Sequence, residues 1–201
     1  MANTNAPFGF RQYAGNGSAP TYEQVLFPIA YNSTNIFFGD PVTAVNDGTV
    51  TQSADTSTPA ALGIAGVFVG CKYLSAVQKR VVWSNYYPGG TDPQSGTIYA
   101  YIVNDPNAKF IVQSDSTGIA LADVNTTIGF KIGSGNTANG ISGAYLDTAT
   151  LQTGTLANYP FKIVAVYDAP PGVQGTLTNG QAYDQAIVMF NNVFTRNFQG
   201  V

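Results

Sequence analysis

Short runs of β-branched and aromatic residues, separated by turn-forming residues, constrain the fold of this chain more than any other feature. The runs are Val25 to Ala30, Ile36 to Phe38, Pro41 to Val45, Gly63 to Cys71, Arg80 to Trp83, Thr97 to Val103, Phe110 to Gln113, Ile128 to Ile132, Phe161 to Tyr167 and Ala186 to Phe194. Turn signals such as Asn46-Asp47-Gly48 and Asn179-Gly180 bound them. The pattern predicts an all-β fold, an antiparallel β-barrel or β-sandwich with long loops.

Helical periodicity with a cap is absent from every long stretch of the sequence. The best candidates for short helical segments are Tyr73 to Lys79 and Ser142 to Leu151. In the second of these, Asp147 and Thr148 are residue types that cap helices. Helix is therefore expected to be a minor component.

The amino-terminal stretch, residues 1–22, lacks the alternation of a strand and interleaves aromatic residues with glycine and proline. Aromatic side chains left in water forfeit their burial energy, so this stretch is expected to pack onto something. Two alternatives stay open, an extended N-terminal arm that binds another molecule and a segment that folds back over the chain's own core. The expected organisation is an arm, residues 1–22, followed by a single β-rich domain, residues 23–201.

The composition is unusually poor in charge. Charged residues make up 9% of the chain, the net charge is −3, and there is no histidine. Hydroxyl and amide side chains supply the polarity instead, while 44% of residues are hydrophobic, which is enough for a sizeable core. A surface with little charge has little self-repulsion and is readily buried against a partner. We therefore expect a homo-oligomer or a component of a larger assembly.

The same composition disfavours catalysis. Without histidine, Ser-His-Asp and Cys-His arrangements and most zinc sites lack their usual residue. Ten aspartates and one glutamate could supply a carboxylate pair, but Asp40, Asp47, Asp92, Asp105 and Asp168 all precede or form turns, where backbone hydrogen bonding explains them. Calcium binding at Asn46-Asp47 or Asn104-Asp105 lacks a complete ligand loop. We expect no catalytic residues, no metal and no cofactor.

Nucleic acid and membrane are also unexpected partners. The eight basic residues are scattered, with only Lys79 and Arg80 adjacent, so no cationic patch is available for a phosphate backbone. The start of the chain resembles no secretory signal, and no apolar stretch is long enough to span a bilayer. Synthesis in the cytosol is expected. The single cysteine, Cys71, lies in a strand-like run and is expected to be a small buried side chain.

A cluster of aromatic residues lies in the middle of the chain. Trp83 precedes the segment Asn85-Tyr-Tyr-Pro-Gly-Gly90, and Tyr99 and Tyr101 follow it. Exposed rings of this kind stack on sugars or anchor protein partners. Packing beneath a turn is the alternative, and packing or a protein contact is favoured over carbohydrate because the segment lacks a charged rim.

Several segments resemble a family of small structural proteins of tailed bacteriophages. The segments that carry the resemblance are Ala2 to Phe10, Phe38 to Val42, Ile64 to Gly70, Asn104 to Asp115, Gly135 to Asp147 and Ile187 to Asn192. Members of that family often have a histidine shortly after the last Phe-Asn, where this chain has Val193. The resemblance covers most of the chain and implies a virion protein.

What the resemblance implies is a cement, or decoration, protein. Such proteins bind the outer surface of the head as small oligomers and bridge neighbouring major capsid subunits, so the expected partners are the major capsid protein and further copies of the chain, as a trimer. The expected capsid contact is the arm, through Phe8, Phe10, Arg11 and Tyr13. A phage tail-fibre or receptor-binding domain that recognises host glycans is the alternative, and a carboxylate-dependent glycosidase is the third reading.

Overall fold

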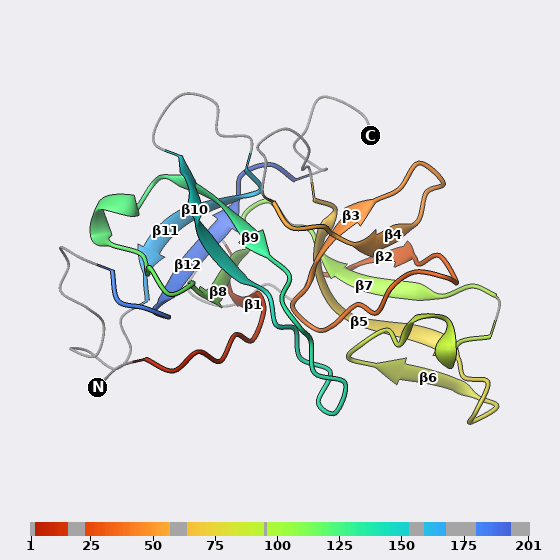
Figure 1. The fold of residues 1–201 in the computed structure, drawn as a ribbon. Helices are drawn as coiled ribbons and strands as arrows, with labels where there is room; N and C mark the ends of the chain where they lie inside the picture. Colours follow the sequence, from red (N-terminus) through yellow and green to blue (C-terminus); the bar gives the residue numbers. More distant parts are fainter. Residues whose placement is uncertain are drawn as a thin grey trace.

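The structure, a computed structural model, describes residues 3–15, 23–56, 64–94, 96–152, 159–167 and 180–193. In this part of the chain the strands form two antiparallel sheets, which lie side by side (Figure 1). The first sheet has the order β1-β8-β12-β11-β9-β10, and the second has the order β2-β7-β5-β3-β4, with β6 paired to β5. The fold is all-β and sandwich-like, as the sequence predicts, and neither sheet closes into a barrel.

Nine strands of the described residues overlap runs predicted from the sequence, whereas β1, β4 and β10 do not, and the predicted run Ile36 to Phe38 forms isolated bridges in place of a strand. The strands of the first sheet are β1 (Arg11–Ala14), β8 (Lys109–Gln113), β9 (Thr127–Lys131), β10 (Tyr145–Gln152), β11 (Phe161–Val166) and β12 (Gln185–Phe190). Those of the second are β2 (Val25–Pro28), β3 (Pro41–Ala44), β4 (Val50–Gln52), β5 (Gly66–Leu74), β6 (Val81–Ser84) and β7 (Tyr99–Val103). Two short 3-10 turns, η1 (Gly89–Thr91) and η2 (Leu121–Asp123), are the helical elements of the described residues, and neither is long and apolar enough to cross a membrane.

A cluster of phenylalanine rings fills the core of the first sheet. Phe10, Phe110, Phe130, Phe161 and Phe190 are all buried. Phe10 stacks on Phe161 with ring centroids 4.3 Å apart and meets Phe110 and Phe130 edge to face. Such pairs stabilise a core by about 0.5–1.5 kcal/mol beyond the burial of their area. The first sheet is therefore held by aromatic contacts among β8, β9, β11, β12 and Phe10, the residue that precedes β1.

Strand β5 connects the two cores because its first part, residues 66–71, packs against both of them. Val67 packs in the core of the first sheet, whereas Phe68 and Cys71 pack in that of the second. Gly66 allows β5 to approach β7 closely at this point, because a Cβ atom there would lie 2.4 Å from the Val103 carbonyl oxygen. A strand buried on both faces loses polar alternation, which is why Gly63 to Cys71 reads as a continuous apolar run.

The turn before β3 joins the two sheets through main-chain hydrogen bonds. The Phe38 amide donates to the Gly140 carbonyl at 2.9 Å, and the Ser142 amide donates back to the Phe38 carbonyl at 3.0 Å. The Phe10 amide, from the first sheet, donates to the Gly39 carbonyl at 2.9 Å. The loop between β9 and β10 thus reaches across from the first sheet to the second.

Asp40 lies at the centre of this joint and is fully buried. Its Oδ1 accepts a hydrogen bond from the Ser142 hydroxyl, and its Oδ2 accepts from the Phe37 amide at 2.8 Å and from Gln52 Nε2 at 2.7 Å. Burial raises the pKa of the Asp40 carboxyl above its ordinary value, and these three hydrogen bonds act in the opposite direction. One carboxylate therefore ties together the β9–β10 loop, the turn before β3 and β4.

The structure corrects both helix predictions. Most of the predicted segment Ser142 to Leu151 belongs to strand β10 (Tyr145–Gln152), and the pairing of β10 with β9 shifts register between Asp147 and Gln152. This irregularity breaks the period-two pattern that would have marked a strand. The segment Tyr73 to Lys79 ends β5 and then turns, with Lys79 at a φ of +54°.

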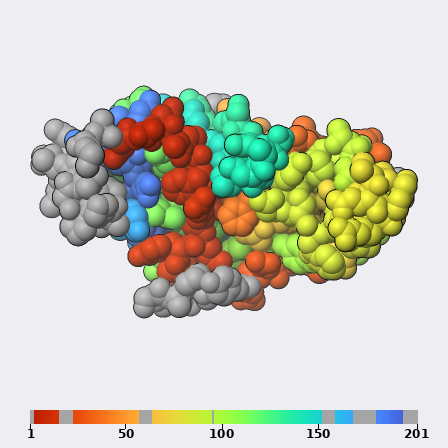
Figure 2. All heavy atoms as spheres, turned by 90° about the horizontal axis from the view of Figure 1, so that it is seen from below, coloured from red at the N-terminus to blue at the C-terminus, as the bar shows by residue number. Residues whose placement is uncertain are grey.

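The amino-terminal stretch folds back over the chain's own core in the residues that the structure describes. Figure 2 shows residues 3–15 lying along the first sheet, where β1 pairs with β8. Of the two alternatives left open for residues 1–22, residues 3–15 follow the second, because burying the Phe10 ring stabilises the segment against the first core. Residues 16–22 lie outside the described residues.

Replacing Asp40 tests whether its hydrogen bonds stabilise the contact between the two sheets. Asp40→Ala leaves two buried donors and one partly buried donor without their acceptor, and we expect it to lower the free energy of unfolding by about 3 kcal/mol. Asp40→Asn retains one oxygen for the Phe37 and Gln52 donors and offers an amide to the Ser142 hydroxyl, so its cost should be less than half as large. Urea unfolding midpoints measure both, and an Asp40→Ala protein as stable as the wild type would contradict this role.

Candidate functional site

The four residues predicted to contact a partner divide between core and surface. Phe10 is buried in the first core and is removed from any contact surface. Arg11 and Tyr13 point outward from β1, with the Arg11 guanidinium 4.9 Å from the centre of the Phe8 ring and Tyr13 43% exposed. Tyr13 also meets the Tyr167 ring edge to face. Phe8, Arg11 and Tyr13 remain candidates for a contact surface, and the register places Ile111 and Lys109 of β8 on the same side as Arg11.

A larger candidate surface is the solvent-facing side of the second sheet. Cross-strand register brings Trp83 of β6, Lys72 of β5, Tyr99 of β7 and Pro28 of β2 into one row across four strands. Directly paired residues share a face of an antiparallel sheet. The pairs Leu74 with Val81 and Leu26 with Tyr101 extend the same side. We call these residues the outer face, defined as Leu26, Pro28, Lys72, Leu74, Val81, Trp83, Tyr99 and Tyr101.

Large apolar side chains on the outer face are open to solvent. Trp83 is 67% exposed, Leu26 53% and Val81 47%, and Leu74 and Tyr99 are also exposed. Scattered surface hydrophobic residues are ordinary, but a set aligned on neighbouring strands of one sheet face is typical of an interaction site. The opposite side of the same strands carries Cys71, Tyr73, Ala100 and Ile102 into the second core. The sheet therefore has one buried and one open apolar side.

Trp83, the single tryptophan of the chain, is held by two polar neighbours. The Lys72 ammonium lies 5.1 Å from the centre of the indole ring, and the indole Nε1 donates to the Tyr101 hydroxyl at 3.1 Å. A cation over an exposed indole contributes about 0.5–1 kcal/mol. The ring is thus oriented on the sheet although most of it faces water.

The tyrosine-rich segment after Trp83 belongs to the interior. Tyr87 is buried, and its hydroxyl donates to the Tyr31 carbonyl at 2.7 Å. Burial raises the pKa of Tyr87 to about 12. The Tyr86 ring stacks on Phe37 with centroids 5.7 Å apart. Trp83, Tyr99 and Tyr101 therefore share a surface, and the segment between them packs beneath it.

Cys71 is buried, as predicted. Its thiol donates to the Tyr86 carbonyl at 3.3 Å, and burial raises the pKa of the thiol to about 12. A thiol that stays protonated at neutral pH is a poor nucleophile. The side chain serves packing of the second core.

Two further carboxylates, the buried Asp184 and the partly exposed Asp92, also bind groups of the protein itself. Asp184 accepts hydrogen bonds from the Ser114 hydroxyl and from the Ile119 amide, and burial raises its pKa. Burial acts to raise the pKa of Asp92, but hydrogen bonds from Ser75, Val77 and Tyr73 outweigh it and lower that pKa. Each of these carboxylates fastens a loop to a strand.

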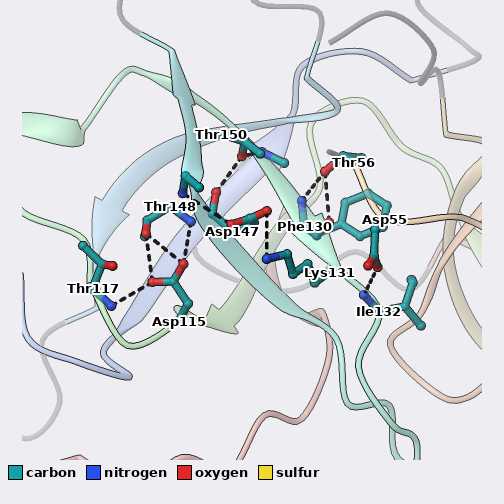
Figure 3. A network of polar contacts seen from close by, with 12 residues as sticks. Asp55, Thr56, Asp115, Thr117, Phe130, Lys131, Ile132, Asp147, Thr148 and Thr150 are labelled. Carbon is teal, nitrogen blue, oxygen red and sulfur yellow. Dashed lines mark hydrogen bonds and ion pairs between the residues drawn. The ribbon is translucent and has the colours of Figure 1, made fainter. Parts of the chain in front are cut away.

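Figure 3 shows a further polar network, around β9 and β10. The Asp147 carboxylate lies 3.5 Å from the Lys131 ammonium, which raises the pKa of Lys131. Asp115 accepts from the Thr148 amide at 2.9 Å and from its hydroxyl at 2.8 Å, and thereby fastens the loop after β8 to β10. Thr150 accepts from the Gly129 amide at 2.7 Å at the register shift of β10. The network replaces regular strand pairing where the ladder is irregular.

The other end of this network fixes the segment that follows β4. The Thr56 hydroxyl donates to the Phe130 carbonyl at 3.0 Å, and Asp55 accepts from the Ile132 amide at 2.7 Å (Figure 3). Asp47 and Asp105 accept from the amides two residues further on, the local pattern expected of turn aspartates. Asp168 lies outside the described residues, among which no group of three His, Cys, Asp or Glu side chains is placed to hold a metal ion.

Sequence reasoning found the aromatic residues of the outer face and missed its aliphatic ones. Leu26 and Val81 lie in predicted strands, but a run of apolar residues does not say which side faces water. Leu74 lies in the segment Tyr73 to Lys79, which was predicted to be helical. The signal that was available is the alternation Val81, Val82, Trp83, Ser84, of which Val82 packs inward. Comparison with known protein families, with curated proteins and with solved structures found no match.

Two alanine substitutions distinguish core from surface aromatic residues. Phe10→Ala removes a ring that contacts three other phenylalanines, so the free energy of unfolding should fall by about 3–5 kcal/mol. Trp83→Ala removes a largely exposed ring and should cost about 1 kcal/mol or less. Urea unfolding measures both, and the outcome that contradicts these assignments is a Trp83→Ala cost equal to that of Phe10→Ala.

Proposed function

We propose that this protein is a non-enzymatic structural protein of a tailed phage virion, a cement protein that binds the outer surface of the head and stabilises contacts between major capsid subunits. The observation that carries the proposal is the outer face of the second sheet, an exposed apolar surface with Lys72 as its one charged member. The family resemblance of the sequence supports the same assignment.

The outer face suits burial against a protein. Removing apolar area from water is worth about 25 cal/mol per Å², and a surface with few charges has little to desolvate. Trp83 and Tyr99 are residue types that anchor protein interfaces, since they contribute large area with few rotatable bonds. Such a surface stabilises the boundary between two neighbouring capsid subunits when it contacts both of them.

An oligomer multiplies this effect. If three copies join around a local three-fold position, each occupied site raises the effective concentration at the next. A trimer with three weak binding sites then stays bound to the capsid under conditions in which a single copy would dissociate. We therefore include a homotrimer in the proposal, made in the host cytoplasm and carried on the head exterior.

One observation favours a second function. The Trp83, Tyr99 and Tyr101 side chains lie on one side of one sheet, and flat aromatic surfaces also stack on sugar rings. A tail-fibre or receptor-binding domain for host glycans would use them in that way. The proposal favours the head because the aliphatic residues Leu26, Leu74 and Val81 extend the surface beyond what a sugar ring would cover.

Capsid binding tests the proposal. The purified protein is mixed with expanded empty capsids, and bound copies are counted from gel band intensities and by electron cryo-microscopy. We expect hundreds of copies per capsid, and a loss of at least about tenfold in affinity for Trp83→Ser combined with Leu26→Ser, since both side chains are exposed. Tyr13→Ser, which alters an exposed residue of β1, is the matched control.

Two outcomes would contradict the proposal. One is a folded wild-type protein that ignores capsids and binds host cells or their glycans, which would favour the tail. The other is capsid binding that Tyr13→Ser abolishes and the Trp83 and Leu26 double variant leaves intact, which would place the contact on β1.

A further inference from the structure

Strand β6 is an edge of the second sheet. In the described residues it pairs with β5 along one side, and no strand pairs with its other side. The β5–β6 hairpin, in yellow, forms one end of the molecule (Figure 2). An edge strand presents a row of main-chain donors and acceptors to any extended segment that approaches it.

The register identifies which residues present those groups. The Ser75 amide donates to the Arg80 carbonyl at 3.0 Å, so these two residues form a hydrogen-bonded pair. Hydrogen-bonded and non-hydrogen-bonded pairs alternate along an antiparallel ladder. The pairs Leu74 with Val81 and Lys72 with Trp83 are then non-hydrogen-bonded. The amide and carbonyl groups of Val81 and Trp83 therefore point away from β5, toward the open edge.

The side chains at the same two positions are exposed and apolar. Val81 and Trp83 lie on the outer face beside the open edge. An added strand would thus gain main-chain hydrogen bonds at the edge and apolar contacts on the face. Natural edges are often protected by inward-pointing charges, prolines or bulges, and none of these lies between Val81 and Ser84.

The charge around this edge is positive. Lys72 lies over the Trp83 ring, and Lys79 and Arg80 are exposed in the turn that precedes β6. No Asp or Glu occurs in the sequence from residue 56 to residue 91. Asp92 approaches the same turn, where its carboxylate accepts hydrogen bonds from Ser75 and Val77. Three cations thus surround an edge on a chain whose net charge is −3.

We propose that β6 binds an extended, acidic segment of a partner protein as an added β-strand. The edge supplies the main-chain pairing, Val81 and Trp83 supply apolar contacts, and the three cations select carboxylates. A two-fold pairing of β6 with β6 of a second copy is disfavoured, since it would bring two sets of Lys72, Lys79 and Arg80 to one seam. The inference rests on the proposed function in one respect, that the partner is a protein.

Two synthetic peptides test the charge requirement. The first is acetyl-Asp-Val-Thr-Val-Thr-Val-Asp-amide, and the second has lysine in place of both aspartates. Binding is followed by the fluorescence of Trp83 and by amide chemical shifts. We expect the acidic peptide to bind at least about tenfold more tightly at low salt, with the largest shifts at Val81 and Trp83. Equal binding of both peptides, or binding of neither, would overturn the inference.

A proline substitution tests the edge itself. Val81→Pro removes one outward amide at the first position of β6, where proline is tolerated in an edge strand, and it leaves the pairing with β5 intact. Val81→Thr is the matched control, because it retains the amide. We expect Val81→Pro to weaken acidic peptide binding at least about tenfold and Val81→Thr to change it little. Unfolding midpoints confirm that both variants are folded, and unchanged peptide binding by Val81→Pro would overturn the inference.

The same variants on capsids separate this inference from the proposed function. If Val81→Pro and the wild type decorate capsids equally, the head function stands and the edge is not used. If the wild type ignores capsids but binds the acidic peptide at β6, the edge stands and the head function fails.

Discussion

The hydrogen bonds to the buried Asp40 carboxylate are the interaction on which the placement of the two sheets depends. Ser142 comes from the loop of the first sheet and Gln52 from a strand of the second, and both donate to this one side chain. A buried carboxylate without partners would be strongly unfavourable, so the geometry is stabilised only when both sheets are in place. Because β5 packs in both cores, its residues on the outer face are also held in place relative to the first sheet.

The strand content could be predicted from the sequence because β-branched and aromatic runs between turn residues have few other folds available. Strand β10 could not, since its register shift removes the alternation that marks a strand. Asp40 was predicted as a turn residue, and its bond to the Phe37 amide is of that local kind, but its partner Ser142 is 102 residues away. The sequence identifies Trp83 as a candidate contact residue. The side of the sheet on which its ring lies follows only from the pairing of β6 with β5.

The scarcity of charge has a structural counterpart. Hydroxyl groups supply hydrogen bonds inside the fold that ion pairs or water would otherwise provide, as Thr56 does on β9 and Thr148 does with Asp115. Because a hydroxyl group carries no charge, burying it costs less desolvation free energy than burying an ammonium or a second carboxylate. On the surface, the small number of charged residues leaves the outer face apolar and suited to a partner. The three cations near β6 are therefore the distinctive electrostatic feature of the second sheet.

The central claim is that the second sheet, and not the amino-terminal segment, is the surface that a partner covers. Amide hydrogen exchange on the free and the capsid-bound protein tests it most directly, because it reports every strand in one experiment. The account predicts slower exchange on binding at residues 81–84, with little change in β1, residues 11–14, which pairs with β8 in the free protein. Slower exchange confined to residues 8–14, with β6 unchanged, would contradict the claim.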